Sequence, residues 1–66
     1  MINAPQSYPV ELNQNGKIYI GRYLIQDGIL RVSFGEASKE APISTMPNEA
    51  VAKVLLRVIL LEGNYD

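Results

Sequence analysis

The side chains that could do chemistry in this chain are seven carboxylates, six basic residues and one adjacent serine and lysine, with no histidine or cysteine. The common general base and the thiolate nucleophile are therefore missing. Ser38 and Lys39 are neighbours in the chain, so on a strand their side chains point to opposite faces. The carboxylates are scattered over expected turns and helix ends: Glu11, Asp27, Glu36, Glu40, Glu49, Glu62 and Asp66. This pattern predicts solvated charges, no catalytic residues and no enzyme.

Metal and cofactor sites have no support in the pattern either. Ordinary zinc sites are built from cysteine and histidine, and neither residue occurs. A disulfide is excluded for the same reason. The five glycines stand at expected turns, in one strand and at a helix end, so they form no phosphate-binding loop. We expect no metal and no cofactor.

Composition and charge limit the class of partner. The chain is 47% hydrophobic and 20% charged, values typical of a globular domain, and its net charge is -1. Such a charge gives no long-range attraction to nucleic acid or to an anionic membrane. The apolar run 54–61 is interrupted by Arg57 and is shorter than the roughly 20 residues of a spanning helix. Residues 1–11 lack the pattern of a signal peptide, so we expect a cytoplasmic protein.

Alternating apolar residues predict three antiparallel strands between residues 8 and 35. Residues 1–7 are interpreted as a loose lead-in, and Pro9 fits an edge strand. A turn is expected within 13–16, and the Asp-Gly pair at 27–28 predicts a tight hairpin that pairs Gln26 with Ile29. The same register pairs Ile25 with Leu30, Tyr23 with Val32, and Gly21 with Phe34. One face then collects Tyr8, Val10, Leu12, Tyr19, Gly21, Tyr23, Ile25, Leu30, Val32 and Phe34.

The remainder of the chain predicts a turn, a short segment and a helix. Gly35 to Ser38 is expected to turn, and Lys39 to Ile43 could add a fourth strand. Pro47 suits the first turn of a helix that ends near Gly63, with Thr45 or Met46 as the cap. The predicted fold is α+β, a single domain over residues 1–66. It is a three- to four-stranded antiparallel meander packed on one C-terminal helix, in the order β-β-β-(β)-α.

The expected helix is apolar on two sides. With 100° per residue, the broader stripe should cover the sheet: Ala50, Val51, Val54, Leu55, Val58, Ile59 and Leu61. Ala52, Leu56 and Leu60 then fall on the side where water should be. They could be isolated exposed side chains sheltered by long basic stems, or the seam between two copies. A domain of this size buries only about 60% of its surface, which favours a partner. We therefore predict a homodimer through Ala52, Leu56 and Leu60.

The second sheet face is half apolar and half charged. It carries Ile18, Ile20, Arg22, Leu24 and Arg31. A dimer joined through Ile18, Ile20 and Leu24 is the alternative to the helix seam. Nucleic-acid binding through Arg22 and Arg31 is a further alternative, although the register places the tyrosines that might stack on bases on the opposite, helix-covered face.

The run GKIYIGRYLIQDGILRVSFGEASKEAPI, followed by PNEAVAKVLLRVILLEG, resembles small uncharacterised bacterial proteins. In these, two strands around a DG-type turn lead to an SK segment and a helix of the type A-x-x-L-L. This chain has ISTM before the helix, where that pattern has glycine or another turn residue. The resemblance implies the fold and no functional residues. We expect a homodimeric protein-interaction or regulatory accessory domain, with a nucleic-acid-binding regulator as the alternative.

Overall fold

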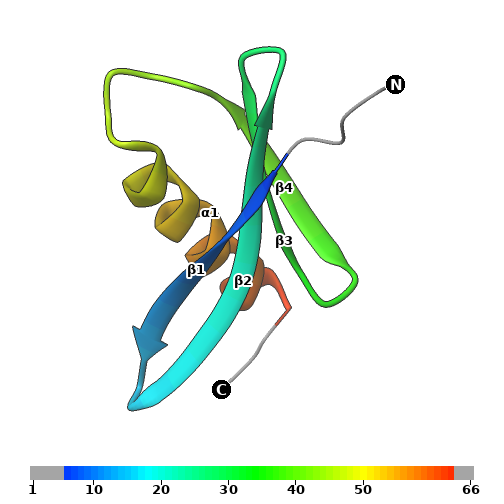
Figure 1. Ribbon diagram of the computed structural model, residues 1–66. Helices are drawn as coiled ribbons and strands as arrows, with labels where there is room; N and C mark the ends of the chain where they lie inside the picture. The colour runs from blue at the N-terminus through cyan, green and yellow to red at the C-terminus, as the bar shows by residue number, and fades with distance from the viewer. Residues whose placement is uncertain (1–5, 64–66) are drawn as a thin grey trace.

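The computed structural model describes residues 6–63 and shows four strands and one helix. The elements are β1 (Ser7–Gln14), β2 (Lys17–Gln26), β3 (Ile29–Phe34), β4 (Ala37–Pro42) and α1 (Asn48–Glu62). The strands form one antiparallel sheet in the order β1-β2-β3-β4, with α1 on one side of it (Figure 1). The predicted α+β fold is confirmed. The expected lead-in is shorter than predicted, because Ser7 already pairs with Leu24, and its residues 1–5 lie outside the described part.

Each hairpin closes through a two-residue turn. Asn15 and Gly16 have φ angles of 55° and 80°, and Asp27 and Gly28 have φ angles of 55° and 75°. Two successive residues with positive φ make a type I′ turn, whose twist matches that of the flanking strands. The predicted Asp-Gly hairpin is thus confirmed, and the turn expected within 13–16 consists of Asn15 and Gly16.

The register between β2 and β3 agrees with the prediction over most of its length. Gln26 pairs with Ile29, Ile25 with Leu30, and Tyr23 with Val32. The observed pairing ends at Arg22 and Ser33, so the predicted pair of Gly21 with Phe34 is not part of the ladder. The Phe34 ring instead meets Tyr19 edge to face, with ring centroids 5.9 Å apart.

The fourth strand is present and begins earlier than predicted. Gly35, with a φ of 60°, forms a tight turn with Glu36. Ala37 then already pairs with Phe34, so the expected turn through Ser38 is too long. A two-residue turn with positive φ only at its first residue is of type II′ and favours glycine there, which explains the early reversal of the chain.

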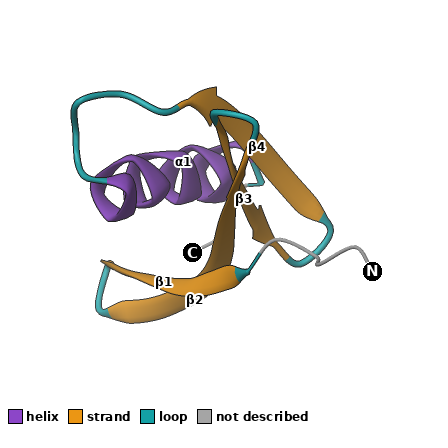
Figure 2. Ribbon diagram, turned by 45° about the horizontal axis from the view of Figure 1, so that its top comes forward, coloured by secondary structure: helices purple, strands orange, loops and turns teal. Residues whose placement is uncertain are grey.

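The core lies between α1 and the face of the twisted sheet that curls around it (Figure 2). The helix packs against β1, β3 and β4. The buried side chains are Val10, Leu12, Leu30, Val32, Ala52, Leu56, Ile59 and Leu60. No polar or charged side chain of the described residues is buried, so the interior is held together by apolar packing and the backbone ladders.

The ends of α1 differ from the prediction. Pro47 is itself the N-cap residue, with φ -56° and ψ 140°, and no side chain caps the helix. Its carbonyl accepts a hydrogen bond from the N–H of Val51 at 3.2 Å. The expected cap at Thr45 or Met46 is therefore wrong. Gly63 ends the helix with φ -83°, in the right-handed region, and its N–H donates to the carbonyl of Ile59 at 2.9 Å.

Candidate interaction surfaces

The predicted dimer seam on the helix is instead its core face. Ala52, Leu56 and Leu60 each have 0% of their surface exposed within the single chain. Side chains that are fully buried in their own domain cannot contact a second copy while that domain stays folded. The prediction of a helix-to-helix contact at these three positions is therefore wrong.

This narrower stripe faces the sheet beside a glycine of β2. A Cβ built on Gly21 of β2 would lie 3.4 Å from Leu56 Cδ1 and 2.8 Å from the carbonyl oxygen of Ser33. Glycine thus allows the close approach of the Ser33 carbonyl, and Leu56 lies at contact distance from the same position. Ala52 and Leu60, on the same side of the helix, are also fully buried and belong to the same core cluster.

The other side of α1 carries exposed apolar residues, which we call the outer helix stripe: Val54, Val58 and Leu61. Val54 and Leu61 are 55% and 67% exposed, and Val58 is half-buried. Of the residues expected to cover the sheet, Ile59 is buried and Val51 and Leu55 pack against the core, as predicted. The prediction is wrong for Val54 and Leu61, which are exposed. The helical wheel contains both stripes and does not show which of them faces the sheet.

The face of the sheet that points away from α1, which we call the open sheet face, is arranged as predicted. Ile18 and Ile20 are 61% and 60% exposed, Arg22 and Arg31 are exposed, and Leu24 is half-buried. Their alternation with the helix-facing residues places all five on this face. Ile20 lies opposite Glu11, and Ile18 lies opposite Asn13, so polar side chains border the two isoleucines.

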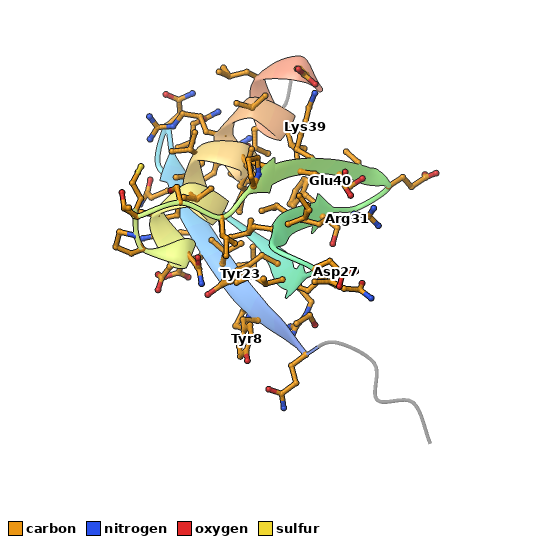
Figure 3. All side chains as sticks on the ribbon, turned by 90° about the horizontal axis from the view of Figure 1, so that it is seen from above. Tyr8, Tyr23, Asp27, Arg31, Lys39 and Glu40 are labelled. Atoms are coloured by element: carbon orange, nitrogen blue, oxygen red, sulfur yellow. The ribbon has the colours of Figure 1, made fainter. Side chains whose placement is uncertain are left out.

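Both arginines of the open sheet face already have partners. Arg31 Nε donates to Glu40 Oε2 at 2.7 Å, and the two side chains lie side by side in Figure 3. Arg22 donates from Nε to the hydroxyl of Ser7 and from Nη2 to its carbonyl oxygen, both at 2.9 Å. Tyr19, Tyr23 and Phe34 pack against the core and Tyr8 lies opposite Tyr23, so among residues 6–63 no aromatic side chain lies on this face beside the arginines.

An open hollow of about 330 Å³ lies at the β2–β3 end of the same face. It is lined by Leu24, Gln26, Asp27, Ile29, Arg31 and Glu40. The Arg31–Glu40 pair neutralises two of its three charges. Among the described residues, no buried polar side-chain atom lacks a hydrogen-bond partner, so none is held ready for a ligand there.

The remaining polar side chains have structural partners or are dispersed. Ser38 lies opposite Ser33 on the open sheet face, whereas Lys39 points to the helix side and pairs with Glu62 at 2.9 Å. Within residues 6–63, no three carboxylates gather in a way that could hold a metal ion. Asp66 lies outside the described residues. The helix of the described region is neither long nor apolar enough to cross a bilayer.

Comparison of the chain with protein-family models, with curated proteins and with solved structures found no match.

Proposed function

We propose that this chain is a small protein-interaction or regulatory accessory domain that acts as a homodimer in the bacterial cytoplasm and carries out no catalysis. The observation that supports the proposal most directly is the placement of its surplus apolar side chains. After the core is filled, Ile18 and Ile20 remain exposed on the open sheet face, and Val54 and Leu61 remain exposed on the helix. Exposed apolar side chains that cluster on one surface mark sites of association.

The open sheet face is the surface we assign to a partner protein. Ile18 and Ile20 are neighbours on one face of β2, and Glu11 and Asn13 lie beside them on β1. An apolar centre with a polar rim is the usual anatomy of a protein interface. Burying one such aliphatic side chain contributes about 1.5–3 kcal/mol, so the two isoleucines could anchor a partner.

Sedimentation equilibrium over a wide concentration range tests the homodimer. Affinity capture with quantitative mass spectrometry tests the sheet face, using the wild type beside Ile18→Lys with Ile20→Lys. Ser33→Lys with Ser38→Lys is the matched control, since it adds the same charge to the same face. Partners kept by the control and lost from the isoleucine variant support the proposal. A wild type that stays monomeric, or partners that bind all three proteins equally, would contradict it.

A nucleic-acid-binding regulator is the second candidate, supported by the exposure of Arg22 and Arg31 on one face. Against it stand the net charge of -1 and the existing hydrogen bonds of both arginines. Titration of single- and double-stranded oligonucleotides at several salt concentrations tests it, because phosphate contacts give a steep salt dependence. Binding that is lost in Arg22→Ala with Arg31→Ala would support this function. No binding at low salt would eliminate it.

A further inference from the structure

The outer helix stripe has the spacing of a coiled-coil seam. Val54, Val58 and Leu61 are separated by four and then three residues, and Val51 precedes Val54 by three. In heptad terms, Val51 and Val58 occupy a positions, and Val54 and Leu61 occupy d positions. Val51 packs at the margin of the core, while the other three lie on the side of α1 away from the sheet. The stripe therefore has the spacing of a short heptad seam, in which Val54 and Leu61 are exposed and Val58 is half-buried.

The charged residues beside this stripe are arranged so that a second copy of the helix would fit against it. Arg57 falls at a g position and Glu62 at the following e position, five residues later. In a parallel pair of helices, the g residue of one helix faces the next e residue of the other, where opposite charges set partner choice and orientation. Arg57 of each copy would then meet Glu62 of the other, which makes two equivalent ion pairs.

The two side chains are free to make these contacts. No carboxylate of residues 6–63 pairs with Arg57. Glu62 contacts Lys39 through Oε1, and its side chain is 59% exposed, so Oε2 is available to a second cation. An antiparallel pair would place the Arg57 flank of one helix against the same flank of the other, where like charges repel. Charge therefore favours the parallel arrangement.

We propose that α1 is the dimerisation element, and that it pairs in parallel with α1 of a second copy through Val54, Val58 and Leu61. This proposal rests on the homodimer of the proposed function and adds its surface and orientation. Valine at a positions with leucine at a d position suits two-stranded parallel coiled coils. The sheets then lie on the outside of the pair, so that Ile18 and Ile20 stay exposed for a partner protein.

The seam is short, so the dimer is reversible and depends on concentration. Stable interfaces bury about 800 Å² per partner. Fewer than two heptads with three apolar side chains cover less than that area. Sedimentation should therefore show monomer and dimer in exchange over accessible concentrations.

Site-specific cross-linking tests the surface and the orientation, and the absence of cysteine provides a clean background. In a parallel two-fold pair each residue lies beside its own counterpart, within the roughly 4.4–6.8 Å between Cα atoms that a disulfide requires. We expect Val54→Cys alone and Leu61→Cys alone to form disulfide-linked dimers under mild oxidation. Ile20→Cys, at a position of similar exposure, is the control and should stay monomeric.

Three other cross-linking or sedimentation results would contradict the proposal, each in a different way. Cross-linking that occurs only when Val54→Cys and Val58→Cys are mixed indicates an antiparallel pair, in which a d position of one helix faces an a position of the other, and overturns the proposed orientation. Cross-linking of Ile20→Cys without the helix variants places the dimer on the sheet, which overturns this inference while the homodimer stands. A wild type that remains monomeric at every concentration overturns both the inference and the homodimer.

A charge exchange tests the ion pairs separately. All variants carry Lys39→Ala, which removes the contact of Glu62 within its own chain. Arg57→Glu should weaken dimerisation by about threefold to tenfold, as expected for exposed charges that change from attraction to repulsion. Adding Glu62→Arg should restore the affinity of the background. Circular dichroism confirms that each variant is folded, and affinities that do not change, or that fall further in the double exchange, would overturn the parallel pairing.

Discussion

Leu56 of α1 packs against Gly21 of β2, at the place where the sheet has no side chain. A Cβ at residue 21 would lie 3.4 Å from Leu56 Cδ1, in contact, and 2.8 Å from the carbonyl oxygen of Ser33, which is closer than a Cβ can be. Leu56 has 0% of its surface exposed. This contact joins the buried side of α1 to a glycine 35 positions earlier in the chain.

Gly21→Ala should therefore destabilise the protein. The added methyl group must displace the backbone at Ser33, and overpacking of this kind typically costs about 1–3 kcal/mol. Urea unfolding followed by circular dichroism measures the change in the free energy of unfolding. Ser38→Ala, on the open sheet face of β4, is the control and should stay within about 0.5 kcal/mol of the wild type. An unchanged stability of Gly21→Ala would contradict the close packing.

Truncating a buried leucine of α1 should lower the free energy of unfolding much more than truncating a leucine of the outer helix stripe. Leu56→Ala leaves a cavity in the core and should cost about 2–5 kcal/mol. Leu61→Ala removes a side chain that is 67% exposed, so its effect should stay within about 0.5 kcal/mol. Unfolding is measured at a concentration where the chain is monomeric. The reverse order of the two effects would show that the helix turns its other stripe to the sheet.

The turn between β2 and β3 should be sensitive to the loss of its glycine. Gly28 has a φ of 75°, and a side chain in the left-handed region costs roughly 1–2 kcal/mol. Gly28→Ala should lower the free energy of unfolding by about that amount, as measured by thermal and chemical denaturation. Asp27→Asn keeps a residue that tolerates positive φ and serves as the control. Equal stabilities of the two variants would argue against the type I′ geometry.

The ion pair of Arg31 with Glu40 should contribute little to stability. The two side chains are 56% and 48% exposed, and exposed pairs usually contribute about 0–1 kcal/mol. A double-mutant cycle with Arg31→Gln and Glu40→Gln measures the coupling energy. We expect at most about 1 kcal/mol, decreasing as salt is added. A larger coupling that persists at high salt would mean that this pair is shielded from water.

Much of the sheet could be predicted because its signals are local. Asn15-Gly16 and Asp27-Gly28 tolerate positive φ, so they mark where the chain reverses, and the alternation along the flanking strands then assigns each side chain to a face. For that reason Ile18 and Ile20 were placed correctly on the uncovered face. The start of the fourth strand could not be predicted, because a turn that begins at Gly35 can have two residues or more. The sequence predicted a turn through Ser38, whereas Ala37 already pairs with Phe34.

The sequence by itself therefore determined the order of the elements, the register of the β2–β3 hairpin and the presence of two apolar stripes on one helix. Only the tertiary structure decided which stripe is buried. Both stripes satisfy the helical period, and the choice depends on a long-range fit between Leu56, the space at Gly21 and the curl of the sheet. That fit buries the predicted seam of Ala52, Leu56 and Leu60 and leaves Val54 and Leu61 exposed, because the helical period of a sequence does not show which side of the helix the sheet will cover.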